Sequence, residues 1–371
     1  MALTIRVYAR RVTAQHTGWD AARFRADIES TLQELVASQA SCLHDLGPDA
    51  LALVEEARSS VSGGKRFRAA FCWWGHQAVA PADPPTDEAA LLRACASLEL
   101  LHASALVHDD YMDASDVRRG RPATHRAFEQ LHRERGWTTS PEQYGASAAI
   151  LLGDLLLSWS DEMLRTCGLP AERVIDALGY FDLTRSEVVT GQFLDVSAQA
   201  RGSADVDTAM TVLRYKSAKY SIERPLHIGA SLAGATPEQI TQLSRFGLPL
   251  GEAFQLRDDL LGVFGDPSVT GKPAGDDLIE GKRTVLVALA FDALPSADAK
   301  VLDAALGTPL SADEVAHLCG LIDSSGARMQ VEEVISELTY RSLNALAAAD
   351  VNSHARDVLE GLASEATQRA V

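Results

Sequence analysis

Six long stretches of the chain carry apolar residues at the three-to-four-residue spacing that lines one face of a helix. Alanine and leucine dominate these stretches, aromatic residues make up only 6% of the 371 residues, and runs rich in Val, Ile and Thr are few. Such a pattern predicts an all-α protein. The predicted helices cover Ala21–Leu43, Glu88–His108, Tyr144–Arg165, Ala171–Gln199, Thr208–Ala233 and Pro237–Leu261.

Local signals mark several helix boundaries. Thr236, Pro237 and Glu238 are typical of an N-cap, a first-turn proline and an early acid, and Gly168-Leu169-Pro170 separates two helices. Loops are predicted at 80–86 and 265–281, which are rich in Pro, Gly and Asp. Since no Ser/Gly linker divides the chain, we expect one large helical domain over 18–371, preceded by a poorly ordered extension at 1–17.

The composition excludes several functional classes. The chain has 34 Lys and Arg against 51 Asp and Glu, a net charge of −17, which argues against a general nucleic-acid binder. Its five cysteines contain no C-x-x-C pair, so they fit neither a disulfide framework nor a zinc site and indicate a reducing, cytoplasmic location. We expect no secretory signal and no transmembrane segment, because no uncharged apolar run reaches about 18 residues.

Two aspartate doublets each follow an apolar helical stretch: Asp109-Asp110 and Asp258-Asp259. If the first helix continues, Asp109 and Asp113 lie one turn apart on one face and repel each other. A hard cation, Mg²⁺ or alternatively Mn²⁺, offsets such repulsion, and substrate phosphates usually complete its coordination. The alternative reading is surface charge or the end of a helix. That alternative explains a single doublet more readily than it explains two doublets that each follow an apolar helix.

The cations of this acidic chain gather near the doublets. They lie at 63–68, where two glycines precede Lys65, Arg66 and Arg68, and at 118–121, directly after the first doublet. Glycines let backbone N–H groups approach phosphate, and arginine binds phosphate through two parallel hydrogen bonds. Each group taken singly also fits a solvated surface. Two separate groups suggest two phosphate-bearing substrates.

Together these motifs resemble the trans-prenyl diphosphate synthases, the family of farnesyl and geranylgeranyl diphosphate synthases, from about Gly63 to Thr284. Residues 109–113 resemble the first aspartate-rich motif DDxxD, 118–120 the following RRG, and 63–68 the GGKRxR motif. The remaining matches, in the family's order, are His102, Gly191-Gln192 with Asp195, Lys216-Ser217, Phe254-Gln255 before Asp258-Asp259, and Lys272 through Thr284. Ser217 departs from the usual threonine, and Gly262 stands where the second motif usually has a third aspartate.

The resemblance implies a fold and a reaction. The fold is a helical bundle around a central apolar cavity, of the isoprenoid synthase type, and the family implies a homodimer. The reaction is a Mg²⁺-dependent head-to-tail condensation of isopentenyl diphosphate with an allylic diphosphate. Metal would be held by Asp109, Asp113 and Asp258, while Lys216 and Arg118 would help to stabilise the departing diphosphate.

The resemblance also implies which residues bind substrate. Isopentenyl diphosphate would be held by Lys65, Arg68, His102 and Arg119. The other implied substrate-binding residues are Arg118, Lys216, Ser217, Gln192, Gln255, Lys272 and Lys282.

Product length is expected to depend on the helix before the first motif. Ser104 and Ala105 precede Asp109 by five and four residues, and both are small. In this family the growing chain runs along that helix, so small residues there predict a product longer than farnesyl, geranylgeranyl diphosphate above all. Leu101, one turn deeper, is the next candidate floor of the cavity. The alternative is that Ser104 and Ala105 only pack against a neighbouring helix.

Other functions stay open at this point. A farnesyl or longer polyprenyl diphosphate synthase, or a class I terpene cyclase, would use similar acids, although a cyclase needs no isopentenyl site. A di-iron helical bundle is the alternative from another class, because Glu99 to His102 and Glu314 to His317 both fit E-x-x-H. A non-catalytic partner subunit is a further alternative, suggested by Gly262.

Overall fold

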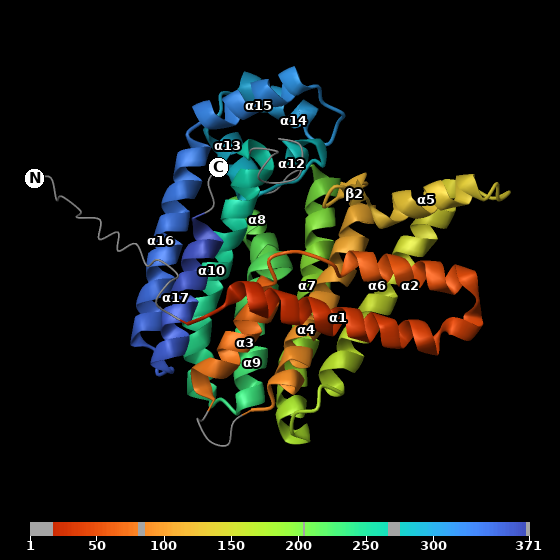
Figure 1. Ribbon diagram of the computed structural model, residues 1–371. Helices are drawn as coiled ribbons and strands as arrows, with labels where there is room; N and C mark the ends of the chain where they lie inside the picture. The colour runs from red at the N-terminus through yellow and green to blue at the C-terminus, as the bar shows by residue number, and fades with distance from the viewer. Residues whose placement is uncertain (1–17, 81–85, 203–204, 266–274, 369–371) are drawn as a thin grey trace, which may run out of the picture.

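The structure, a computed structural model, describes residues 18–80, 86–202, 205–265 and 275–368. Within these ranges it is a bundle of helices, crossed in front by α1 and α2 and topped by α12 to α15 (Figure 1). The helices are α1 (Ala21–Cys42), α2 (Pro48–Ser60), α3 (Phe67–Val79), α4 (Glu88–Met112), α5 (Thr124–Glu134), α6 (Pro141–Arg165), α7 (Ala171–Arg201), α8 (Val206–Val212), α9 (Arg224–Ala233), α10 (Pro237–Phe264), α12 (Asp276–Ile279), α13 (Val285–Ala293), α14 (Ser296–Ala305), α15 (Ala312–Ser324), α16 (Ala327–Ala348) and α17 (Ser353–Thr367), with a 3₁₀ turn, η2 (His44–Leu46), and a π-helix, η3 (Leu213–Glu223).

The all-α prediction is confirmed, and most predicted boundaries agree with the structure. The Thr236 side chain accepts from the Gln239 backbone N–H in a capping box, with Pro237 in the first turn. The second predicted helix runs on past His108 to Met112, which places Asp109 inside α4. The expectations for residues 1–17 lie outside the described residues.

One predicted helix differs from the structure. The stretch 208–233 divides into α8, the π-helix η3 and α9. Backbones pack closely on both sides of η3: a Cβ added to Gly191 of α7 would lie 2.4 Å from the Lys216 nitrogen, and one added to Gly251 of α10 would lie 2.4 Å from the Ala218 oxygen. The spacing of apolar residues in the sequence does not reveal this tertiary packing, so the sequence predicts a single helix. Turns of π-helix occur often at functional sites.

The core consists of two apolar clusters. The larger joins α1, α2, α3, α4, α6, α7, η3, α9 and α17 with the first half of α10, and the smaller joins the second half of α10 with α8, α13, α15 and α16. Helix α4 is long and apolar enough to span a membrane by length and composition alone, but 72% of its most apolar stretch is buried inside the protein. Core helices of soluble proteins have the same character, so α4 belongs to the core.

The region after residue 294 supports α10. Helices α16 and α17 pack against α10, and the buried Arg257 links all three. Its guanidinium donates to both Glu332 carboxylate oxygens at 2.6 Å and to the Thr367 carbonyl at 3.0 Å. Since Asp258 is the next residue, the C-terminal helices fix the backbone from which the second aspartate cluster projects.

A short hairpin follows α4. Strands β1 (Val117–Arg118) and β2 (Arg121–Pro122) pair antiparallel, and strand structure within the described ranges is confined to them. The two turn residues, Arg119 and Gly120, have φ of 51° and 74°. Positive φ at both positions is typical of the primed turns that close two-residue hairpins. The RRG sequence is therefore a tight turn that holds its two arginines beside the end of α4.

Candidate active site

The two aspartate clusters lie at the same end of the bundle. Helices α4 and α10 both end at the upper edge in Figure 1, beneath α12 and beside the hairpin. Asp109 is in the last turn of α4 and Asp113 is its C-cap, while Asp258 and Asp259 are near the end of α10. Residues from α7, η3 and the segment after α12 complete the site.

Asp109 is paired with cationic and amide groups. Its Oδ1 accepts from Lys216 Nζ at 3.2 Å and from Gln192 Nε2 at 2.9 Å, and Lys216 Nζ also contacts Asp195 Oδ2 at 2.6 Å. Burial raises the pKa of Asp109, but Lys216, Lys282 and Arg118 outweigh burial and lower it to about 2. Asp109 is therefore ionised at neutral pH.

Asp110 points away from that group and binds the hairpin. Arg118 Nε donates to both Asp110 carboxylate oxygens, at 2.9 and 3.1 Å, and Arg118 Nη2 also contacts Oδ1. Because Asp110 is buried, this two-point ion pair fixes the hairpin to α4. Arg118 consequently stands near Asp109 while its own charge is already paired.

Asp113 is the least satisfied acid of the site. Its side chain is 2% exposed, and within the described residues neither carboxylate oxygen accepts a hydrogen bond. The nearest cation is Lys282, whose Nζ lies 3.6 Å from Oδ2. Burial and the charge of Asp109 raise the pKa of Asp113 to about 7. A buried carboxylate without donors is a strong candidate for a cation ligand.

The second cluster includes a carboxylate from outside α10. Asp259 accepts from Gln255 Nε2 at 2.8 Å, and burial together with Asp277 and Asp258 raises its pKa to about 8. A Cβ added to Gly262 would lie 1.9 Å from Asp277 Oδ2. The Asp277 carboxylate thus lies where a side chain at position 262 would begin, so an acidic group is present there although the third aspartate of the motif is missing.

Lys282 links the two clusters. Its Nζ lies 3.6 Å from Asp113 Oδ2 and 3.3 Å from Asp277 Oδ1, and it also contacts Glu280. Glu280 in turn accepts from Ser115 just after α4, at 2.8 Å. Burial lowers the pKa of Lys282, but these acids outweigh burial and raise it well above its usual value. The structure therefore brings the first and second aspartate motifs to one place.

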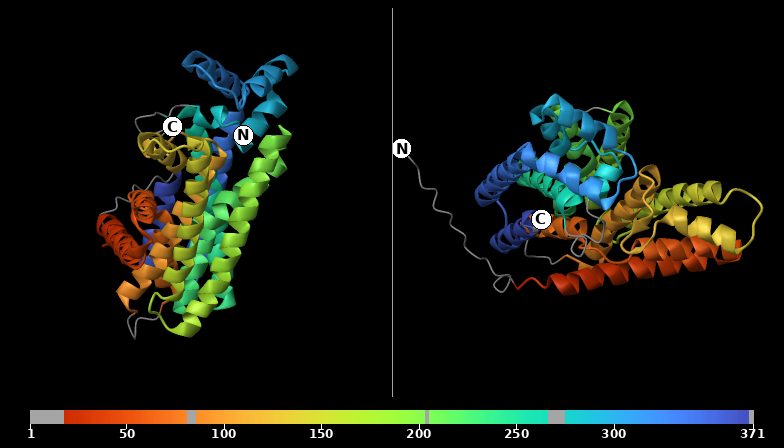
Figure 2. Two further views of the ribbon diagram at one scale, coloured as in Figure 1. Left: turned by 90° about the vertical axis from the view of Figure 1, so that its right-hand side faces the viewer. Right: turned by 90° about the horizontal axis from the view of Figure 1, so that it is seen from above.

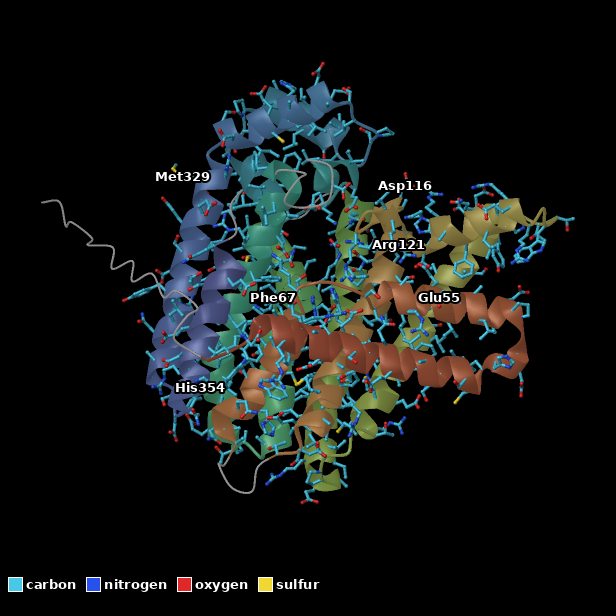
Figure 3. All side chains as sticks on the ribbon, in the orientation of Figure 1. Glu55, Phe67, Asp116, Arg121, Met329 and His354 are labelled. Carbon is cyan, nitrogen blue, oxygen red and sulfur yellow. The ribbon has the colours of Figure 1, made fainter. Side chains whose placement is uncertain are left out.

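The cations of the glycine-containing basic loop, residues 63–68, differ in their contacts and in their exposure to solvent. Arg66, at φ 57°, is 4% exposed and contacts Glu29 of α1, Glu99 of α4 and the Val61 carbonyl. Phe67, labelled near the centre of Figure 3, stacks edge-on against Phe254 of α10. Lys65 is exposed and Arg68 is half-buried. The loop is thus anchored by Arg66 and Phe67 and presents Lys65 and Arg68.

Arg68 and His102 meet at Tyr220 of η3. The Arg68 Cζ lies 4.1 Å from the Tyr220 ring centroid, and His102 Nδ1 lies 2.5 Å from the Tyr220 hydroxyl oxygen. Arg119 is exposed and donates to the Ser62 carbonyl at 2.5 Å, which brings the hairpin turn against the basic loop. The four residues expected to hold isopentenyl diphosphate therefore converge from three elements, next to the acids.

The three candidate chain-length residues lie on α4, before Asp109. Leu101 and Ser104 are each 3% exposed, whereas Ala105 is half-buried. Leu101 and Ser104 are thus enclosed by neighbouring side chains, and Ala105 is the more open position.

Several residues complete this picture. Ser217 follows Lys216 in η3, and Lys272 lies outside the described residues. The predicted site did not include Asp195, Asp277, Glu280 or Tyr220. The match at Gly191-Gln192 contained Asp195, and the match from Lys272 to Thr284 contained Asp277, so a sequence signal existed for both. Glu280 and Tyr220 had none.

The residues present fit a hard divalent cation. Among the described residues no three His, Cys, Asp or Glu side chains stand close enough together to hold a metal by themselves. The Asp113 carboxylate, whose oxygens accept no hydrogen bond within the described residues, the ionised Asp109 and the oxygen-only donor set nevertheless match Mg²⁺, which takes few protein ligands and completes its shell with water and phosphate.

The two E-x-x-H pairs have other roles. Glu99 accepts from the Ala69 backbone N–H at 3.1 Å and pairs with Arg66, while His102 contacts Tyr220. Glu314 forms the capping box of α15 with Ser311. These contacts account for both glutamates without iron.

Comparisons with known proteins agree with this geometry. The polyprenyl synthetase family model matches residues 52–322. A geranylgeranyl pyrophosphate synthase from Corynebacterium glutamicum, solved with isoprenyl diphosphate and magnesium, is 40% identical, has a TM-score of 0.92, and is aligned over 95% of this chain and 100% of its own.

Two curated relatives differ in product. A geranylgeranyl diphosphate synthase from Mycobacterium tuberculosis is 31% identical over 329 residues, 87% of each chain. A geranylfarnesyl diphosphate synthase from Natronomonas pharaonis is 34% identical over 242 residues, 62% of this chain and 66% of that protein.

The raised pKa of Asp113 predicts a pH-dependent stability. The folded protein keeps this proton up to about pH 7, whereas an unfolded chain releases it near 3.8, so this group's contribution to stability falls as pH rises from about 4 to 7. Without metal, Asp113→Asn should therefore raise the free energy of unfolding by on the order of 1–3 kcal/mol above pH 7 and by little at pH 4. Denaturant titration across this range measures it.

The control for this experiment is Asp45→Asn, because the Asp45 side chain is fully exposed and should show no such trend. An Asp113→Asn protein that is less stable than the parent at pH 8 would contradict the assignment.

Proposed function

This chain belongs to the polyprenyl synthetase family of trans-prenyltransferases, and we propose that it condenses isopentenyl diphosphate head-to-tail with allylic diphosphates to make geranylgeranyl diphosphate. The observation that carries the proposal is the arrangement of charges. Acids from the end of α4 and from α12 meet around Lys282, the α12 acid Asp277 lies against Gly262 of α10, and a separate basic pocket of Arg68, His102 and Arg119 lies beside them. Two adjacent sites suit two diphosphate substrates.

Asp109, Asp113 and Asp258 would hold Mg²⁺. When bound, the metal neutralises the negative charge of the allylic diphosphate and of the diphosphate that leaves. The chain's own acids suit it, because Asp113 accepts no hydrogen bond from any part of the chain that the structure describes and Asp109 stays ionised beside Lys216. Oxygen ligands also accept Mn²⁺, which is the alternative ion.

The cations of the site assist at the same place. Lys216 and Lys282 are half-buried, charged and held in position by acids on two sides, so they would present fixed positive charge where a leaving diphosphate gains negative charge. Preorganised charge of this kind is worth about 10²–10³ in rate per group removed. Gln192 orients Asp109, and Arg118, which Asp110 holds in place, would add positive charge on the hairpin side.

The second substrate would be held without metal. Lys65 and Arg119 are exposed beside the half-buried Arg68 and the partly buried His102, so they can bind an incoming diphosphate from solvent. Holding isopentenyl diphosphate beside the allylic carbon makes the attack effectively intramolecular. No side-chain nucleophile is needed, and the departing diphosphate is the base for the final proton.

Product analysis tests the function. The purified chain, given isopentenyl diphosphate with dimethylallyl, geranyl or farnesyl diphosphate and Mg²⁺, should form geranylgeranyl diphosphate as the main product, identified by mass spectrometry. Omitting either isopentenyl diphosphate or Mg²⁺ should abolish it.

Each alternative function gives a different result in the same assay. A class I terpene cyclase would convert an allylic diphosphate alone into a hydrocarbon. A non-catalytic partner subunit would give no product by itself, and a farnesyl or longer polyprenyl synthase would stop at another length. Any of these outcomes contradicts the proposal.

We further propose that the growing chain passes Ala105. This residue is small, half-buried and one turn before Asp109, whereas Ser104 beside it is almost completely enclosed. A phenyl group in that position would occupy the space that the fourth prenyl unit needs. Ala105→Phe should therefore shift the main product from geranylgeranyl to farnesyl diphosphate, measured as the ratio of chain lengths.

Ala105→Ser serves as the matched control, because it changes the polarity of the position with little change in volume. The proposed path of the growing prenyl chain past Ala105 is wrong if the Ala105→Phe enzyme is still active and gives the same ratio of product lengths as the parent.

We also propose that the chain works as a homodimer through α6 and α7. Large apolar side chains are exposed on both helices: Ile150 and Leu151 on α6, and Ile175, Leu183, Val189 and Phe193 on α7. The two helices form one side of the bundle, facing the viewer in the left-hand part of Figure 2. Extended apolar surface of this kind is typical of an interface.

Val189→Asp should therefore halve the mass measured by light scattering, because it places a charge in the centre of that surface. Met329→Asp is the matched control: Met329 is equally exposed, 66% against 63%, but lies on α16, labelled at the upper left of Figure 3. A monomeric parent protein, or a Val189→Asp dimer as stable as the Met329→Asp dimer, would contradict this interface.

A further inference from the structure

Tyr220 is a buried phenol in the middle of the basic pocket, and no motif of the sequence singled it out. It is 5% exposed and lies one turn after Lys216 in η3. Its hydroxyl oxygen is 2.5 Å from His102 Nδ1 on α4, and its ring lies 4.1 Å from the Arg68 guanidinium carbon on α3. One side chain therefore contacts two cationic or basic residues that arrive from different helices.

The neighbour of Tyr220 strengthens the contact with Arg68. Arg68 Nη2 donates to the Ser221 hydroxyl at 2.8 Å, so residues 220 and 221 hold the guanidinium from two directions. A guanidinium over a tyrosine face is stabilised by the negative charge of the π system. Arg68 is thus kept in one orientation before any anion binds.

Both groups of the Tyr220–His102 contact are neutral. Burial raises the pKa of Tyr220 to about 12 although the charge of Arg68 lowers it, so the hydroxyl keeps its proton at neutral pH. Burial and the charges of Arg68, Arg119 and Arg118 lower the pKa of His102 well below its usual value, so the imidazole is neutral and one of its nitrogens is an acceptor. With Nδ1 2.5 Å from the hydroxyl oxygen, the phenol can donate to His102 when the imidazole hydrogen is on Nε2.

We propose that Tyr220 is a positioning residue for isopentenyl diphosphate: its hydroxyl donates to His102 Nδ1 and so fixes the His102 tautomer that carries hydrogen on Nε2, while its ring holds Arg68. This inference rests on the proposed function only for the identity of the diphosphate. A neutral histidine with hydrogen on Nε2 is a hydrogen-bond donor from that atom, whereas the other tautomer would present a lone pair to the anion and repel it. Tyr220 therefore decides whether His102 attracts or repels diphosphate.

Tyr220→Phe separates the two roles of the side chain, because it keeps the ring under Arg68 and removes the hydroxyl. With ¹⁵N-histidine labelling, and His102→Asn to assign the signal, the parent protein should show His102 with hydrogen on Nε2 and the variant a mixture of tautomers. The KM for isopentenyl diphosphate should rise about 5- to 10-fold, which corresponds to about 1–1.4 kcal/mol. The KM for the allylic diphosphate and kcat should change less than about twofold.

Tyr215→Phe is the matched control, since it removes a hydroxyl from the same π-helix at a residue whose ring lies near Lys219 instead. It should leave the His102 tautomer and both KM values unchanged. Tyr220→Leu, which also removes the ring, should raise the KM for isopentenyl diphosphate further than Tyr220→Phe does.

The inference is overturned by hydrogen on Nδ1 of His102 in the parent protein, by an unchanged tautomer in Tyr220→Phe, or by an unchanged KM for isopentenyl diphosphate. The tautomer is measured on the resting protein without substrate. A parent protein that does not use isopentenyl diphosphate would thus contradict the proposed function, while the tautomer result would still decide the role of the Tyr220 hydroxyl.

Discussion

Repulsion between buried carboxylates is the constraint that organises this protein. The ends of α4 and α10 bring Asp109, Asp113 and Asp259 into one region with Asp277 of α12, and two of these acids have pKa values raised to about 7 and 8. Lys216 and Lys282 lie between these acids and partly compensate their charge. In the part of the chain that the structure describes, Asp113 has only one nearby cation, Lys282 at 3.6 Å, and this shortage of positive charge is the basis on which we propose that the site binds a divalent cation and, with it, diphosphate.

Much of the surrounding structure keeps these charges in place. Gly191 lets α7 approach η3 so closely that Gln192 and Asp195 both reach the Lys216–Asp109 group. Asp110 fixes the hairpin through Arg118, and Arg257 fixes α10 to the C-terminal helices. Residues next to the predicted ligands thus have a structural role, and a substitution at Asp110 or Arg257 would disturb the site without removing a ligand.

The same division applies to the basic loop. Arg66 is as cationic as Lys65 and Arg68, yet it is buried against Glu29 and Glu99 and supports the loop from within. Arg68 depends on Tyr220 and Ser221 of η3 for its orientation. Arg66 is therefore the structural cation of the loop, while Lys65 and Arg68 are more accessible to solvent. Helix α1, which crosses in front of the bundle in Figure 1, contacts the loop through Glu29.

The helices, the aspartate motifs and the basic groups could be predicted from the sequence, because apolar period, capping residues and short charged motifs are local properties of a chain. The position of Asp113 relative to Asp109 followed from helical spacing in the same way. Contacts across the bundle could not be predicted: the Asp277 carboxylate beside Gly262, the π-helical path of η3, and the Tyr220 hydroxyl on His102 join residues 15 to 118 positions apart. Which cations are free and which are paired depends on those contacts, since burial and partners, not residue type, set the charge that a side chain offers to a ligand.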